Sequence, residues 1–147
     1  MANPGPAITN TANQQSLTSQ QALRLIGVAK GVSVSAAGDT AFSILGSTQN
    51  WLPVSIITSN SITTATGATV SVATATVGVY TQPNQGGATV LTTAALTSQA
   101  ASTYVKVQAA TNAATAIVGA GSVLYANVGT TVAGAQVDLY VYGYDLS

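Results

Sequence analysis

The chain has 147 residues, of which 4% are charged, and its three basic and three acidic residues sum to a formal net charge of zero. A neutral chain offers no electrostatic attraction to nucleic acid, an anionic membrane or an acidic substrate, so we expect none of these as partners. Histidine, glutamate and cysteine are all missing, which excludes Ser-His-Asp and Cys-His catalytic groups, cysteine metal sites and disulfides.

The first segment, residues 1–22, is predicted to be an extended N-terminal arm. It is polar and rich in Asn, Gln, Pro and Gly, with Ile8 and Leu17 as its large apolar residues, so it has too little apolar surface to fold by itself. Either it is a disordered tail, or it lies on a neighbouring subunit with Ile8 and Leu17 as anchors. A short helical turn at 16–23 stays open. Its start lacks the basic and apolar regions of a secretory signal, so no export is expected.

The remainder, residues 23–147, reads as one all-β domain, an antiparallel β-sandwich, because short β-branched segments alternate with turn residues. The expected strands cover residues 23–30, 32–35, 40–45, 51–59, 69–81, 89–93, 103–109, 122–128 and 136–144. Gly31 is expected to separate the first two strands. Pro53 predicts a strand start or a sheet edge. Ala-rich residues 94–101 and 112–116 are compatible with helical turns, and the Pro and Gly residues at 82–87 predict a tight connection.

The last strand gives the clearest assignment of faces. Val137, Leu139 and Val141 alternate with polar and aromatic residues, which predicts an aliphatic face toward the core. Tyr140 and Tyr142 then point outward, either into an interface or under another part of the same subunit. Trp51 is expected in the core, with an interface anchor as the alternative. The candidate interface residues are Ile8, Leu17, Trp51, Tyr140 and Tyr142.

The three aspartates are the only carboxylate side chains. Asp39 follows Gly38 in a turn, where it is expected to accept backbone hydrogen bonds, and nothing in the sequence brings it near Asp138 or Asp145. A calcium ion held partly by backbone carbonyls between subunits remains an alternative. We predict no enzyme activity and no catalytic, cofactor-binding or metal-binding residue. Since ordinary domains have about 25% charged residues, we expect partner proteins to cover much of the surface; a neutral secreted domain is the alternative.

Two segments carry a resemblance to a known group of proteins. Residues 78–91 (GVYTQPNQGGATVL) and 137–146 (VDLYVYGYDL) resemble small virion proteins of tailed bacteriophages, in which a "G-[VI]-[YF]-T…GG" strand and loop precede an Ala/Thr-rich stretch and the chain closes on a "[VI]-[YF]-V-x-G-x-D-L" strand. The resemblance covers about residues 39–146. It implies a jelly-roll-like sandwich that decorates or cements the capsid exterior, commonly as a trimer, and holds major capsid subunits together. Such a protein is made in the host cytoplasm without a signal peptide.

Three other functions remain as alternatives. A head-fibre or tail-associated virion protein would need a longer fibrous segment. A carbohydrate-binding module would stack sugars on outward aromatic residues such as Tyr140, Tyr142 and Trp51. An ice-binding protein is suggested by the Thr content, although the Thr-Ala-Thr pairs at 64–66 and 74–76 do not extend into a regular ladder.

Overall fold

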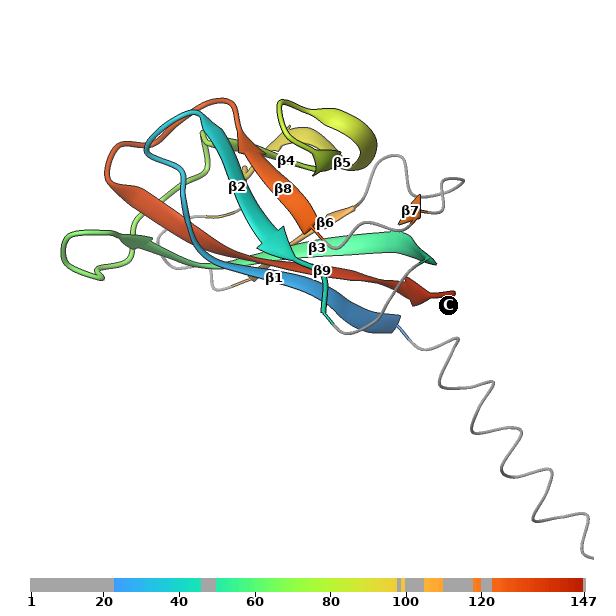
Figure 1. Cartoon of the computed structure of the whole chain (residues 1–147). Coiled ribbons are helices and arrows are strands. Elements are labelled where there is room, and N and C mark those ends of the chain that lie inside the picture. The colour runs from blue at the N-terminus through green and yellow to red at the C-terminus, as the bar shows by residue number, and fades with distance from the viewer. Residues whose placement is uncertain are drawn as a thin grey trace, which may run out of the picture.

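The computed structural model describes residues 23–45, 50–97, 99, 105–109, 118–119 and 123–146, and within them the chain forms nine strands and no helix. In chain order the strands are β1 (Leu23–Ser33), β2 (Gly38–Ser43), β3 (Asn50–Thr63), β4 (Thr76–Gln82), β5 (Gly86–Ala95), β6 (Val105–Ala109), β7 (Val118–Gly119), β8 (Val123–Val128) and β9 (Ala135–Asp145) (Figure 1). In this described part, no helix is long and apolar enough to cross a membrane. The predicted arm at 1–22 and the helical turn considered at 112–116 lie outside it.

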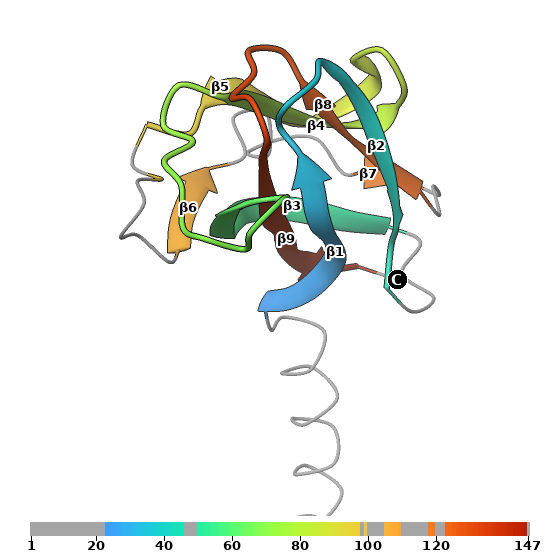
Figure 2. The ribbon, with the colours of Figure 1, turned by 90° about the vertical axis from the view of Figure 1, so that its left-hand side faces the viewer.

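The strands form two antiparallel sheets that pack as two layers (Figure 2). The larger sheet has the order β1-β9-β3-β6, with the two-residue β7 beside β3, and the smaller sheet has the order β2-β8-β4-β5. If β7 is set aside, the first strand pairs with the last, the second with the second last, and so on inward to β4 and β5. This nested pairing wrapped into two sheets is the jelly-roll arrangement. It confirms the predicted all-β, jelly-roll-like antiparallel sandwich.

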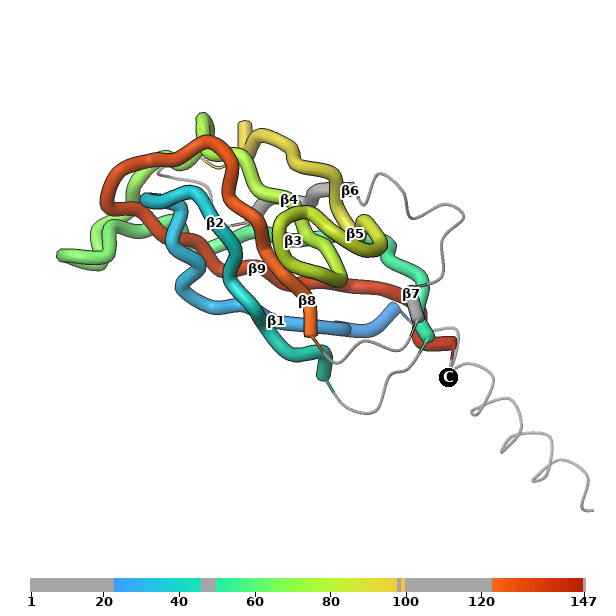
Figure 3. The backbone as a smooth tube through the Cα atoms, turned by 45° about the horizontal axis from the view of Figure 1, so that its top comes forward, coloured from blue at the N-terminus to red at the C-terminus, as the bar shows by residue number. Residues whose placement is uncertain are grey.

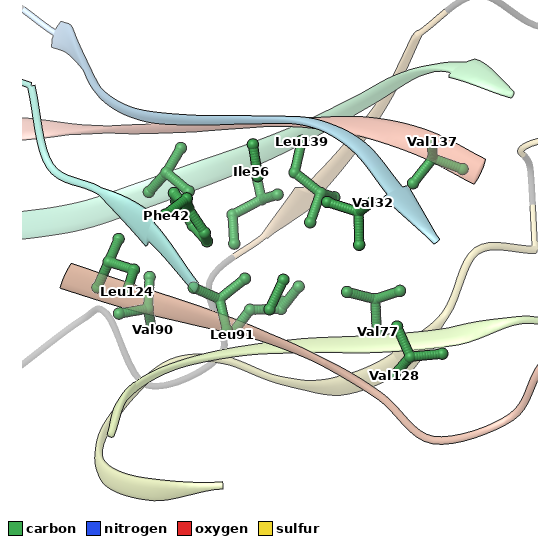
Figure 4. Packing of buried hydrophobic residues seen from close by; sticks show 14 of the residues in the cluster. Val32, Phe42, Ile56, Val77, Val90, Leu91, Leu124, Val128, Val137 and Leu139 are labelled. Carbon is green, nitrogen blue, oxygen red and sulfur yellow. The ribbon is translucent and has the colours of Figure 1, made fainter. Parts of the chain in front are cut away.

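The aliphatic core lies between the two sheets (Figure 4). On the larger sheet, Val137, Leu139 and Val141 of β9 are fully buried, which confirms the inward face predicted from their alternation. Leu91 and Leu124 are among the residues that meet them from the smaller sheet. Complete burial of an aliphatic side chain is worth about 1.5–3 kcal/mol, so this layer supplies most of the stabilisation.

The longest predicted strand, residues 69–81, is wrong in its first half. β4 begins only at Thr76, and apart from one isolated bridge at Thr69 the preceding residues form no ladder. Val72 is nevertheless fully buried, and its N–H donates to the carbonyl of Gln99 at 3.1 Å. The β-branched composition therefore indicated burial correctly, but burial at this place is achieved by a loop. In the segment 94–101, where a helical turn was considered, the first two residues continue β5, and the N–H of Gln99 donates to the carbonyl of Leu96 at 2.7 Å, which closes a single turn and no helix.

A glycine and a proline lie inside strands. Gly31 was expected to end a strand, but β1 runs through it, because a positive φ of 63° is accommodated at a bulge. Pro53 was expected at an edge or a strand start. β3 as a whole lies between β9 and β6, but among the described residues Pro53 has a partner only in β9, because β7 pairs with Asn50 and Trp51 and β6 begins to pair at Ser55. The pairing with β9 shifts register between Pro53 and Ser55, and such an irregularity is where a sheet tolerates proline.

β9 is the strand on which the larger sheet is built, because it lies between β1 and β3 (Figure 3). Both of its ladders are interrupted at adjacent residues. The ladder to β1 skips residues 30–31 opposite Asp138, and the ladder to β3 skips residues 60–61 opposite Val137. Two bulges therefore lie on either side of β9 next to Asp138.

The carboxylate of Asp138 joins these two bulges. Asp138 is buried, with only 8% of its surface exposed. The N–H of Gly31 donates to Oδ1 at 2.8 Å, and Nδ2 of Asn60 donates to Oδ2 at 3.2 Å. Asn60, like Gly31, has a positive φ, of 53°. Because hydrogen bonds to an ionised acceptor are stronger than neutral ones, this carboxylate stabilises both irregular strands against β9.

We expect Asp138→Asn to lower the free energy of unfolding by about 1–3 kcal/mol, because the new amide nitrogen would face one of the two donors and leave it unpaired. Unfolding in denaturant can be followed by the fluorescence of Trp51, the only tryptophan, which is buried. Arg24→Gln is the control. It removes an ion pair to Asp145 in which the arginine side chain is 46% exposed, so a loss of at most about 1 kcal/mol is expected. Equal losses in the two variants would contradict this role of Asp138.

Candidate functional site

The outer side of the larger sheet carries three outward-pointing tyrosines. Val137, Leu139 and Val141 point into the core, so Tyr140 and Tyr142 between them point to the other side. Tyr144 continues the same alternation toward the end of β9. The sequence therefore placed Tyr140 and Tyr142 on the correct side of β9.

Neighbouring strands extend this surface, because directly opposed residues lie on the same face of a sheet. Each tyrosine has an apolar residue of β1 opposite it, and two of the three also have one in β3. From the end of the sheet inward, the rows are Leu23, Tyr144 and Leu52; then Leu25, Tyr142 and Ser55; then Val28, Tyr140 and Ile57. We call these nine residues the outer apolar face.

The outer apolar face is partly open to solvent and carries no ionisable group other than the tyrosine hydroxyls. Leu23 is 48% exposed, Leu25 36% and Tyr144 37%, and the other members are half-buried. None of the described strands lies over this side of the sheet; the smaller sheet covers the opposite side (Figures 1 and 2). A contiguous apolar surface with tyrosines and without charge is typical of the centre of a protein interface.

Trp51 is a core residue, as expected, and not an interface anchor, which was the alternative. It is 1% exposed, and it packs so closely on β9 that a Cβ added to Gly143 would lie 2.8 Å from its Cε3 atom. As a candidate interface residue it therefore has almost no surface to offer. Ile8 and Leu17, the candidate anchors in the arm, lie outside the described residues.

Seven members of the outer apolar face were not predicted, and four of them are Leu23, Leu25, Leu52 and Tyr144. The sequence does indicate, by local alternation, that some of these residues share a face of their strand: Leu23 and Leu25 flank Arg24, and Tyr144 follows Tyr142 at the period of a strand. What the sequence could not show was the register that sets β1 and β3 beside β9. That register passes through bulges, which no periodicity reveals.

The three aspartates lie apart and each has a structural partner. Asp138 holds the two bulges, Asp145 pairs with Arg24 at 3.1 Å, and Asp39 accepts hydrogen bonds on the smaller sheet. Within the described ranges, no three side chains of the metal-binding types come together. The arrangement shows no pair of carboxylates placed for acid and base chemistry.

Asp39 fastens the β4–β5 turn to the outer side of the smaller sheet. Its Oδ2 accepts the N–H of Asn84 at 2.7 Å, and its Oδ1 accepts Nδ2 of Asn127 at 2.7 Å. Nε2 of Gln85 donates to Oδ1 of Asn127 at 2.9 Å. Asp39 thus accepts a backbone hydrogen bond as predicted, but from a turn 45 residues away and not from its own. The outer sides of the two sheets therefore differ: around Asp39, the smaller sheet carries polar side chains that hydrogen-bond one another, whereas the larger sheet carries the outer apolar face.

We expect Asp39→Ala to release the β4–β5 turn while leaving the sandwich folded. Loss of the carboxylate leaves the N–H of Asn84 and Nδ2 of Asn127 without this acceptor; water can replace it at the exposed Asn84, so the cost is about 0.5–1.5 kcal/mol. Hydrogen exchange should become faster at the amides of Asn84 and Gln85 and stay unchanged in β9. Ser35→Ala, which removes only an exposed hydroxyl contact to Ser33, should change neither. Unchanged exchange at the turn in Asp39→Ala would show that other contacts hold it.

Scans against family models, curated proteins and solved structures give no match for this chain. What the outer apolar face does therefore has to be inferred from its residues and their geometry.

Proposed function

We propose that this protein is a non-enzymatic structural protein that decorates or cements a bacteriophage capsid by packing against neighbouring protein subunits. The observation that carries the proposal is the outer apolar face. It exposes leucine and tyrosine side chains on a chain with 4% charged residues, a composition that disperses a free monomer poorly. A partner that covers the face removes this apolar surface from water.

The part of the proposal that concerns packing is supported by what the polar side chains do. The aspartates hold strands and a turn in place, and the polar groups of the smaller sheet bind one another. Their hydrogen-bonding capacity serves the fold. The remaining accessible chemistry of the larger sheet is apolar contact, which suits a protein partner better than a small polar substrate.

The part that concerns a capsid is supported by the resemblance of residues 78–91 and 137–146 to virion proteins of tailed phages. Jelly rolls occur both in viral capsid proteins and in lectins, so the fold is compatible with this function without selecting it. The proposed partners are the major capsid protein and other copies of this chain, for which the resemblance implies a trimer. The proposed place of action is the capsid exterior.

A cement function requires many weak contacts acting together. One apolar face of this kind gives a modest contact, because association costs several kcal/mol of lost motion before any burial counts. Copies that bind a repeating lattice and one another gain avidity, which strengthens the assembly without any single strong contact. A small neutral domain with one apolar face is adequate for that mode of action.

The carbohydrate-binding alternative gains less support from the same face. Sugar sites combine an aromatic ring with several hydrogen-bonding groups. Here Tyr140 lies between Val28 and Ile57, and Tyr144 lies between Leu23 and Leu52. Trp51, the third aromatic residue considered, is buried.

The proposed function predicts saturable binding to phage capsid shells that lack their decoration protein, measured by co-sedimentation. Leu25→Lys places a charge on the outer apolar face and should reduce occupancy at a given free concentration at least about tenfold. Ser43→Lys adds the same charge at an exposed position of β2 in the smaller sheet and should bind like the natural protein.

Two results would argue against this function. If the natural protein fails to bind any expanded shell, the capsid part of the proposal is wrong. If both lysine variants lose binding equally, the effect comes from net charge and the outer apolar face is not involved. Circular dichroism and Trp51 fluorescence verify that each variant is folded.

A further inference from the structure

We infer that the outer apolar face is a contact surface for a second copy of this chain, packed face to face about a two-fold axis. This inference rests on the proposed packing function, because it names one partner of the same face. It also replaces the trimer implied by the resemblance with a dimer as the species formed in free solution.

The exposed apolar side chains of the molecule are concentrated at one end of the larger sheet. In the described part of the chain, the exposed large apolar residues are Leu23, Leu25, Leu45, Tyr144 and Leu146. The first two begin β1, and the last two lie at the end of β9, which pairs with that part of β1. Leu45 lies beside β1, since its N–H donates to the carbonyl of Ile26 at 2.7 Å. The patch is therefore a single one that continues the outer apolar face.

Because the described exposed apolar residues form one patch, a second copy that offers an apolar surface in return must use the same patch. In a two-fold contact each copy presents the same patch, so leucine and tyrosine meet leucine and tyrosine. In a head-to-tail contact the patch would have to meet another surface, such as the outer side of the smaller sheet. There the patch would cover the polar contacts of Asp39, Asn84 and Asn127. The described surface therefore favours face-to-face pairing.

The charges around the face are also compatible with a second copy. The whole chain is neutral, so two copies do not repel each other at long range. The ionised groups that flank the first rows are Arg24 and Asp145, which form one ion pair and cancel locally. Asp138, the next ionised group along β9, is buried in its own hydrogen bonds. Lys30 is exposed at the β1 bulge, just beyond the third row, where its long side chain can keep the ammonium group in water. Pairing two faces over the three rows therefore buries no unpaired charge.

The size of the face sets the expected strength of the contact. Three strands spaced about 4.8 Å apart, each contributing about six residues at about 3.3 Å, cover roughly 14 by 20 Å in projection. Standard interfaces remove about 800 Å² from each partner, which is more than this area supplies. We therefore expect a reversible dimer with a dissociation constant in the micromolar range or above, and not an obligate one.

Sedimentation equilibrium of the full chain without capsids tests the inference. The natural protein should show a monomer–dimer equilibrium, and Leu25→Lys should raise the dissociation constant at least about tenfold, because a charge would be buried in the contact. Ser43→Lys, which adds the same charge to the other sheet, should leave the constant unchanged. Tyr144→Lys, at another exposed position of the face, repeats the test if Leu25→Lys does not fold.

Chemical cross-linking tests the geometry, because the chain has no cysteine of its own. Ser55→Cys places one thiol in the middle row of the face, next to Tyr142. Ser43→Cys places one on the outer side of the smaller sheet. A short bis-maleimide reagent should join two copies of the Ser55 variant into a dimer and should leave the Ser43 variant monomeric.

Three outcomes would overturn the inference. The first is a natural protein that stays monomeric at several hundred micromolar; if it still binds capsid shells, the proposed function stands and the face contacts the capsid. The second is an oligomer that neither Leu25→Lys nor Tyr144→Lys weakens. The third is a monomer that dimerises only after residues 1–22 are deleted, which would assign the face to the chain's own N-terminal segment.

Discussion

The larger sheet depends on one buried carboxylate. Asp138 lies on the strand shared by β1 and β3, and it accepts hydrogen bonds from both at the level where each of them bulges. Side chains alternate with a period of two, so a bulge decides which residues of a strand point inward after it. On one side of this level lie the rows of the outer apolar face. Further register shifts lie among these rows, at Leu25/Gly27 in β1 and Pro53/Ser55 in β3, so the face depends on these irregularities as well as on Asp138.

Much of the architecture could be predicted from the sequence, for reasons that are visible in particular segments. Residues 136–144 alternate cleanly because β9 is covered by the core on one side only, and the Pro-Asn-Gln-Gly-Gly connection forms a turn in which Asn84, Gln85 and Gly87 have positive φ. Prediction from the sequence failed where the same residue type is compatible with two different local structures. A glycine with positive φ suits a strand end and a bulge equally, so Gly31 gave no sign of which it was. Val72 is buried in a loop with the same composition as a strand.

Only the part of the candidate site that lies on a single strand, β9, could be predicted from the sequence. Tyr140 and Tyr142 follow from the alternation of β9, which needs no knowledge of its neighbours. Val28 lies opposite Tyr140 and Leu52 opposite Tyr144 through pairings between segments about 90 or more residues apart in the chain, and these pairings depend on topology. Trp51 is a similar case: its place beside Gly143 is a tertiary contact, although core burial was the expected role. Composition predicts a surface covered by partners, and the pairing register brings together the apolar residues on which that proposal rests.

The nested pairing of the jelly roll also has a consequence for the order of events during synthesis. β1 is made first among the described strands and β9 last, yet they are neighbours in the finished sheet, and β3 pairs with β9 on its other side. Until β9 leaves the ribosome, β1 and β3 have no strand to join them, and their leucine, isoleucine and valine residues remain uncovered. Folds dominated by such distant pairings form slowly and expose apolar strands in the meantime. The nascent chain is therefore expected to depend on chaperones until β9 has left the ribosome, and to fold as a whole once β9 is available.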